Sequence, residues 1–100
     1  MEIKVQSIRF DADRKLIDFI NEKVRKLSQF TDDIIVGEVF LRIDKSDDKS
    51  NKIAEVKILI PGKELFAKKQ CRSFEAATDS AVEALRRQIR KTKGKRLAAY

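Results

Sequence analysis

The chain has 100 residues, with 23 Lys and Arg against 16 Asp and Glu, so its formal net charge is +7. This length fits one domain of ordinary size, and the excess of positive charge favours a polyanionic partner. A single cysteine excludes an internal disulfide, and the lack of histidine removes the usual activator of a cysteine nucleophile. The start lacks a signal-peptide core, and no apolar run approaches membrane-spanning length. We therefore expect one soluble, cytoplasmic domain over residues 1–100, with no enzymatic activity, cofactor, metal, membrane contact or small-molecule substrate.

The N-terminal part of the chain predicts a strand followed by a helix. Apolar and polar residues alternate over 2–8, as on a half-buried strand. A helix is expected over about 13–29, begun by Asp11 or Asp13, because either carboxylate can accept free backbone N–H groups. Its apolar stripe has helical spacing and consists of Leu16, Ile17, Ile20, Val24 and Leu27.

The middle of the chain predicts three further strands. Two of them cover 35–43 and 54–60, and a polar loop over 44–51 connects them. The third follows Pro61-Gly62, which is a turn signal. Because the connections are short, these strands are expected to form an antiparallel meander. The residues expected to face the core are Val39, Leu41, Ile43, Ala54, Val56, Ile58, Ile60, Leu65 and Ala67.

The C-terminal part of the chain predicts a long helix over about 74–93. Ser73 is a suitable N-cap residue, and apolar residues follow it at intervals of three or four. Thr92 and Gly94 weaken helix formation, so the end of the chain over 94–100 is expected to fray. The apolar stripe consists of Phe74, Ala77, Ala81, Leu85 and Ile89.

The order of elements, β-α-β-β-β-α, predicts an α+β fold in which two helices pack on one face of a four-stranded sheet. The other face of the sheet is then wet. Aromatic rings among its cations could form a nucleic-acid platform, but we favour ordinary cross-strand pairs for Phe40 and Phe66. The side chains expected on the wet face are Lys4, Phe40, Arg42, Lys57, Leu59, Phe66 and Lys68.

The excess positive charge is concentrated in LRRQIRKTKGKR, residues 85–96. The part over 86–96 holds seven cations and no acid, which leaves 16 basic residues against 16 acidic ones elsewhere. At 100° per residue, the cations from Arg86 to Lys93 fall opposite the apolar stripe and form a solvent-facing ridge. Cations late in a helix also complement its dipole, but that explains one or two of them and not seven. A solvated basic tail is the alternative for the last few residues.

The predicted first helix adds cations in its last turns. If both helices lie side by side on one face, their basic ends converge on one surface that can read the spacing of phosphates. The alternative is a solvated face with Glu22 and Lys26 paired along the helix. The candidate RNA-binding residues are Lys23, Arg25, Lys26, Arg86, Arg87, Arg90, Lys91, Lys93, Lys95 and Arg96.

Three features carry a resemblance to a known family: the first strand, the basic end of the first helix over 23–27, and the segment 74–95. In their order and spacing, the chain resembles the short ribosome hibernation promoting factors, also called ribosome-associated inhibitor A or sigma-54 modulation proteins, over nearly its full length. Two positions depart from the family pattern. Glu75 stands where many members have tyrosine, and Thr78 replaces an aliphatic residue. The family's basic residue near the end of the first strand matches Arg9 only with a one-residue shift.

This resemblance implies binding to the small ribosomal subunit and its rRNA at the decoding region. There the chain would block mRNA and tRNA, inhibit translation and preserve inactive ribosomes. Recognition would depend on the shape and charge of the RNA backbone. The resemblance leaves open whether a separate ribosome modulation factor acts with the chain to pair ribosomes.

Two other functions are possible from the sequence. A general double-stranded-RNA-binding module, not tied to the ribosome, also ends in a basic helix, but it starts with a helix and uses a lysine cluster in a loop. A calcium site could use the loop spacing of Asp44, Ser46, Asp48 and Glu55. Lys49 is found where that loop needs glycine, and strands flank it, so calcium binding is disfavoured.

Overall fold

The computed structural model describes residues 1–45 and 49–98, with side chains described as far as Thr92. Along the chain it contains β1 (Glu2–Ser7), α1 (Arg14–Arg25), a short 3-10 helix η1 (Lys26–Gln29), β2 (Val36–Ile43), β3 (Lys52–Ile60), β4 (Lys63–Cys71) and α2 (Phe74–Ala98). The order β-α-β-β-β-α and the α+β class are therefore confirmed.

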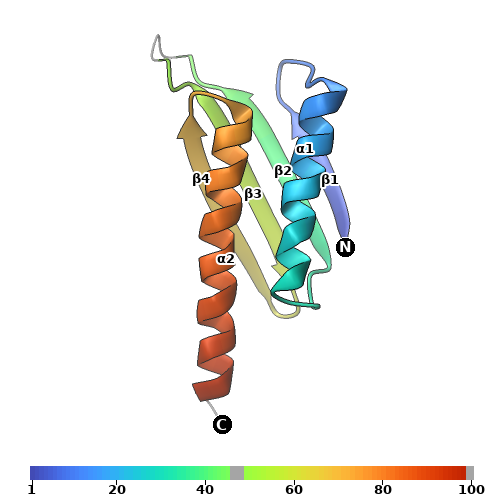
Figure 1. Cartoon of the computed structure of the whole chain (residues 1–100), viewed down its shortest axis with the longest axis vertical. Coiled ribbons are helices and arrows are strands. Elements are labelled where there is room, and N and C mark those ends of the chain that lie inside the picture. Colours follow the sequence, from blue (N-terminus) through green and yellow to red (C-terminus); the bar gives the residue numbers. More distant parts are fainter. Residues whose placement is uncertain (46–48, 99–100) are drawn as a thin grey trace.

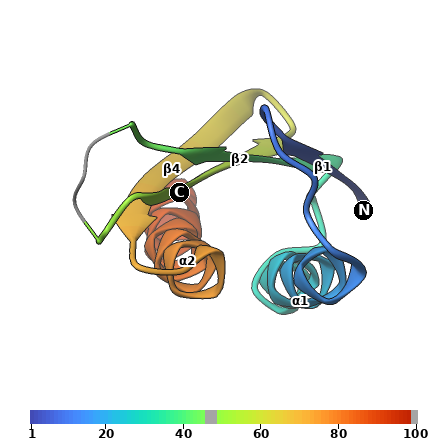
Figure 2. The same ribbon diagram turned by 90° about the horizontal axis from the view of Figure 1, so that it is seen from above.

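One mixed sheet forms one layer and two helices form the other. The strand order is β1-β2-β3-β4. The last three strands form the expected antiparallel meander, whereas β1 pairs with β2 in parallel. Both helices cover the same face of the sheet (Figure 2). They also run in the same direction, so their C-terminal ends point toward the same end of the molecule (Figure 1).

The helices begin where their capping residues predict. The carboxylate of Asp13, and not that of Asp11, accepts a hydrogen bond from the backbone N–H of Leu16 at 2.8 Å. The hydroxyl of Ser73 accepts one from the backbone N–H of Ala76 at 3.0 Å. Each bond satisfies a donor that the first turn leaves unpaired.

The core lies between the helices and the sheet, and the predicted stripes fill it. All five stripe residues of α2 are buried, as are Ile20, Val24 and Leu27 on the first helix. Gly37 lets α1 lie close to the sheet, because a Cβ at that position would come within 3.2 Å of Val24 Cγ1. This contact helps to fix the position of the basic end of α1.

Two helix boundaries and the burial of one strand residue differ from the sequence-based expectation. The first helix is α-helical only to Arg25 and continues as η1. Ile43 is 46% exposed, because it is the last residue of β2 and lies beside the polar loop. The last helix continues through Gly94 to Ala98, since one glycine costs only about 1 kcal/mol in a helix that packing already holds. Fraying over 94–100 stays a prediction.

Thr78 is an unusual core residue, because its side chain is fully buried and its hydroxyl has no hydrogen-bond partner among the described residues. Removing an unsatisfied buried hydroxyl at constant shape is favourable. We expect Thr78→Val to raise the free energy of unfolding by about 1 kcal/mol, measured by urea denaturation. Thr92→Val is the control, because the Thr92 hydroxyl donates to the Gln88 carbonyl oxygen at 3.0 Å. An equal gain from both variants would contradict this explanation.

Candidate nucleic-acid interface

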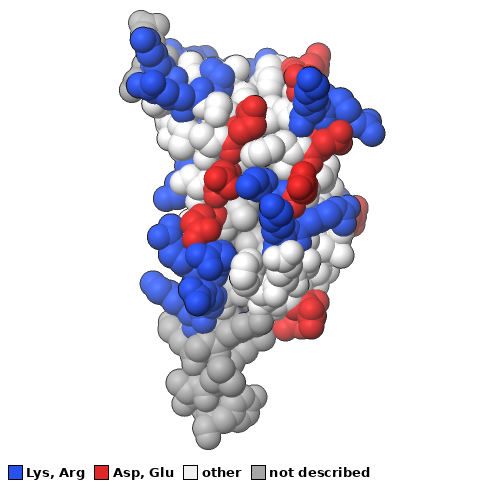
Figure 3. All heavy atoms as spheres, in the orientation of Figure 1, with Lys and Arg blue, Asp and Glu red and all other residues white. Residues whose placement is uncertain are grey.

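The helix-covered side carries several groups of cations, at the upper corners of Figure 3 as well as along the two helices. In Figure 3 acidic side chains follow the upper part of α2, and basic side chains cover its lower described part. Further basic side chains lie near the middle of this view, beside the lower part of α1. Both basic helix ends therefore lie on the same side of the sheet, and their convergence on one RNA-binding surface stays a prediction.

Five of these cations are exposed and available to a partner. They have no carboxylate within salt-bridge distance among the described residues. We call this set the free cations. The free cations are Arg25, Lys26, Arg87, Arg90 and Lys91.

Lys23 occupies a different position from the free cations. Its side chain is only 28% exposed, and its Nζ lies 3.1 Å from Asp79 Oδ1 on α2. The same Nζ lies 5.6 Å from the centroid of the Phe19 ring. Lys23 therefore bridges the two helices, and its predicted contact with RNA stays a prediction.

Arg86 is only partly exposed on the ridge, and its predicted contact with RNA stays a prediction. Its side chain is 31% exposed and forms a salt bridge with Glu83 one turn earlier. Its guanidinium lies over the Phe30 ring, 5.7 Å from the ring centroid. The hydrogen bond from Arg86 holds the pKa of the Glu83 carboxyl below its ordinary value, and it raises the pKa of Arg86. Arg86 leans toward η1 because that side of α2 faces the first helix.

The remaining predicted cations fall outside the described side chains. Lys93, Lys95 and Arg96 belong to the helical part of the backbone that ends at Ala98, but their side chains are not described. Their contribution to RNA binding stays a prediction.

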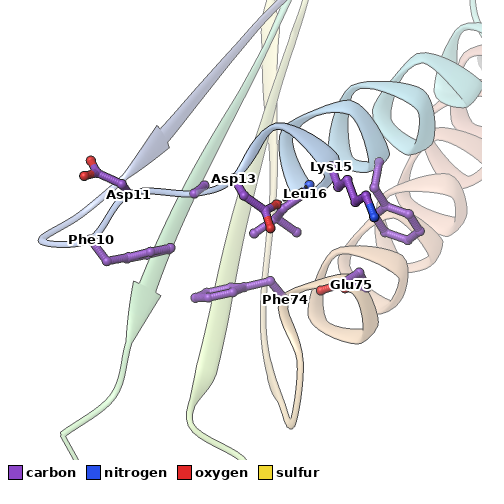
Figure 4. A pocket seen from close by; sticks show the side chains of 9 residues that line it. Phe10, Asp11, Asp13, Lys15, Leu16, Phe74 and Glu75 are labelled. Carbon is purple, nitrogen blue, oxygen red and sulfur yellow. Dashed lines mark hydrogen bonds between the residues drawn. The ribbon is translucent and has the colours of Figure 1, made fainter.

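One hollow at the other end of the helices suits a polyanion poorly. It has a volume of about 540 Å³, and the rings of Phe10 and Phe74 stack within it at a centroid distance of 5.0 Å (Figure 4). The carboxylates that line it are those of Asp11, Asp13 and Glu75, against the single cation Lys15. Among the described residues, no cluster of His, Cys, Asp or Glu could hold a metal ion.

The wet face of the sheet carries paired charges. Glu55 on β3 bridges Arg42 at 2.9 Å and Lys68 at 3.9 Å, and Lys57 lies 3.7 Å from Glu64. These pairs join neighbouring strands, as expected for an ordinary exposed sheet. Because carboxylates neutralise its cations, this face is a weaker candidate for binding a polyanion than the helix ends are.

The described residues give no support for a calcium site at the polar loop over 44–51. Positions 46–48, which include Ser46 and Asp48, lie outside the described residues. Of the other two candidate ligands, Glu55 is engaged with cations on the sheet. Asp44 accepts a hydrogen bond from the Gln70 side chain at 3.1 Å.

Arg9 belongs to a second, smaller group of cations that the sequence reasoning did not assemble. Its φ of 65° is in the left-handed region, in the turn between β1 and α1. With Arg42 and Lys45 it lines a hollow of about 370 Å³ at one end of the sheet. The grouping has no sequence signal, because Arg9 is far from Arg42 and Lys45 along the chain.

Fold and charge together define a class of protein: a small α+β domain with one cation-rich helical end and, among its described residues, no metal-binding cluster. Residues 3–97 match the model of the family described as "Sigma 54 modulation protein / S30EA ribosomal protein". The chain belongs to this family. Over the described residues, neither helix is long and apolar enough to cross a membrane.

Several relatives have printed names that describe a role. The ribosome hibernation promoting factor of Pseudomonas putida is 26% identical over 95% of this chain and 89% of its own length. That of Klebsiella oxytoca is 27% identical over 95% of this chain and 96% of its own length. The ribosome hibernation promotion factor of Deinococcus radiodurans is 31% identical over 76% of this chain, which matches 40% of that relative.

Two solved structures share the fold. The N-terminal domain of Thermus thermophilus Protein Y has a TM-score of 0.79 at 22% identity, covering 92% of this chain and 99% of that one. A ribosomal subunit interface protein from Coxiella burnetii has a TM-score of 0.83 at 20% identity, covering 94% and 99%.

Proposed function

We propose that this chain is a cytoplasmic ribosome hibernation factor. It binds the small ribosomal subunit at the decoding region, blocks mRNA and tRNA, inhibits translation and preserves inactive ribosomes. Family membership and the names of its relatives support this role. The observation that carries it is the set of five free cations at the C-terminal ends of two parallel helices.

The geometry fits binding by charge and shape. Two rows of cations held on separate rigid helices can contact phosphates of different strands or turns, which a single basic helix cannot do. Phosphate contacts position a protein on RNA without reading its sequence. A compact domain bound in this way excludes other ligands by occupying their space, so inhibition needs no chemical step.

Translation in a cell-free system tests this function. Added protein is expected to inhibit synthesis in proportion to the fraction of small subunits that carry it, measured by sedimentation of the same reactions. Inhibition should weaken when mRNA and tRNA are raised, because they compete for the same place. Normal synthesis at saturating occupancy would contradict the proposal.

The same assay separates this function from a general RNA-binding module. A plain RNA duplex in excess over ribosomes would relieve inhibition by such a module, because duplex and ribosome would compete for the protein. For a factor fitted to the small subunit, we expect the duplex to leave inhibition nearly unchanged. Relief at equimolar duplex would favour the general module.

A further inference from the structure

A small groove lies where α2 crosses the outer strand of the sheet. β4 is an edge strand with β3 as its one partner, and α2 lies across it (Figure 1). The volume of the groove is about 210 Å³, more than the roughly 150 Å³ cavity that can hold a benzene ring, so it has room for one ribose with its phosphate. We call it the edge groove. Its lining comes from the start of β4 and the second half of α2, namely Lys63, Glu64, Leu65, Gln88, Lys91 and Thr92.

Gln88 is held in the edge groove with a free hydrogen-bond acceptor. Its side chain is half-buried, and its Nε2 donates to the backbone carbonyl oxygen of Phe66 on β4 at 2.9 Å. Because a carbonyl oxygen can only accept, this bond fixes which end of the amide is the nitrogen and leaves Oε1 as an acceptor. Among the described residues, none donates to Oε1, and this oxygen is not a buried atom. An incoming hydroxyl can therefore reach it.

Two lysines share the edge groove with this acceptor. Lys91 of α2 is one of the free cations, and Lys63 at the start of β4 is also exposed. Within the described part of the chain, Lys63 too has no carboxylate at salt-bridge distance. The carboxylate that lines the groove belongs to Glu64 and lies 3.7 Å from Lys57 Nζ. A phosphate in the groove would therefore meet two unpaired cations and one carboxylate that is already paired.

We propose that the edge groove binds one ribose-phosphate unit of an RNA backbone. Lys63 and Lys91 hold the phosphate, and Gln88 Oε1 accepts a hydrogen bond from the ribose 2′-hydroxyl. The 2′-hydroxyl is the group by which a protein distinguishes RNA from DNA. Two lysines alone would hold either backbone, whereas the oriented amide adds a contact that only RNA can make. This inference rests on the proposed function, because it extends the RNA-binding surface of α2 to the edge of the sheet and names the chemical group that is selected there.

Two forms of one RNA hairpin test the edge groove with the full chain at low salt. They have the same sequence, but one carries 2′-fluorine in place of every 2′-hydroxyl, which keeps the sugar pucker of RNA and cannot donate a hydrogen bond. We expect the natural chain to bind the hydroxyl form roughly fivefold more tightly, the gain of one neutral hydrogen bond. Gln88→Met has a similar size but no amide, so it should bind both forms equally. Its affinity for the fluoro form should match that of the natural chain.

Matched variants separate the hydroxyl contact from charge. Gln6→Met changes an exposed glutamine on β1 and should keep the preference for the hydroxyl form. Lys63→Gln should weaken both forms to the same extent and flatten the salt slope by about 0.7 to 0.9, because one phosphate contact is lost. Lys4→Gln removes the same charge from an exposed position on β1 and should change neither affinity nor slope appreciably. Circular dichroism is the folding control for all four variants.

Three results would overturn the inference. They are failure of the hydroxyl form to bind at low salt, equal binding of the two forms by the natural chain, and a preference that survives in Gln88→Met. Equal losses from Lys63→Gln and Lys4→Gln would remove Lys63 from the phosphate site and overturn the groove as proposed. Binding of the natural chain to small ribosomal subunits, measured in parallel, would still support the proposed function in each case, whereas its absence would refute that function separately.

Discussion

Replacing Arg87, Arg90 and Lys91 together with glutamine is expected to weaken binding to the small ribosomal subunit on the order of a thousandfold. These three cations are exposed on α2 and have no carboxylate partner among the described residues. A hydrogen bond to a charged group contributes about 1.5–3 kcal/mol, so three lost contacts amount to roughly three or more powers of ten. The fold should be intact, because all three side chains lie outside the core.

The salt dependence of this binding gives a second, quantitative test of the same prediction. If about five phosphates are neutralised by the natural chain, log affinity should fall with log salt at a slope of about −3.5 to −4.5. Loss of three contacts should flatten that slope by about 2 to 3. Equilibrium binding across a salt series measures it, with circular dichroism as the folding control.

The matched control removes three charges from the polar-loop region: Lys45, Lys49 and Lys52, each changed to glutamine. Net charge falls by the same amount, but these lysines belong to the loop and the start of β3, away from the free cations. We expect a much smaller loss of affinity and a nearly unchanged slope. Similar losses from both variants would mean that net charge is enough and that the helix ends are not a site.

The sequence predicts the fold of this chain well because local patterns agree with the tertiary structure. Alternation marks the strands, and intervals of three and four mark the helices. Asp13 and Ser73 mark the two helix starts by the chemistry of their side chains. The change from α1 to η1 at Lys26 has no comparable signal, because an α-helix and a 3-10 helix bury nearly the same residues over a single turn.

The candidate site is less predictable, because it depends on which residues of neighbouring elements lie next to each helix. Periodicity gives the angle of Arg86 around α2, but not the presence of Phe30 next to it. The bridge from Lys23 to Asp79 joins residues that are far apart in the sequence. The sequence does not single out Phe30 as a contact of Arg86, although Phe30 is an aromatic residue three positions after the basic run over 23–27. Charge concentration thus located the surface, and only the three-dimensional structure separated its free cations from its paired ones.

Leu85→Ala is expected to lower the free energy of unfolding by about 2–5 kcal/mol, the range for truncating a fully buried leucine. Leu85 is fully buried in the core beneath α2, so truncation removes apolar contacts and leaves a cavity. A domain of this size has about 5–15 kcal/mol of total stability, and the variant should still fold at 25 °C. Urea denaturation measures the loss.

Arg87→Ala is the counterpart to this variant, two positions further along the same helix. Its side chain is exposed and unpaired among the described residues, so stability should change by no more than about 0.5 kcal/mol. Affinity for the small subunit should fall about tenfold or more, as expected for one charge-assisted contact. Leu85→Ala should show the opposite pattern, with reduced stability but unchanged affinity per folded molecule, because no cation is altered. A large loss of stability in Arg87→Ala would mean that the ridge serves the fold, and binding would then need another surface.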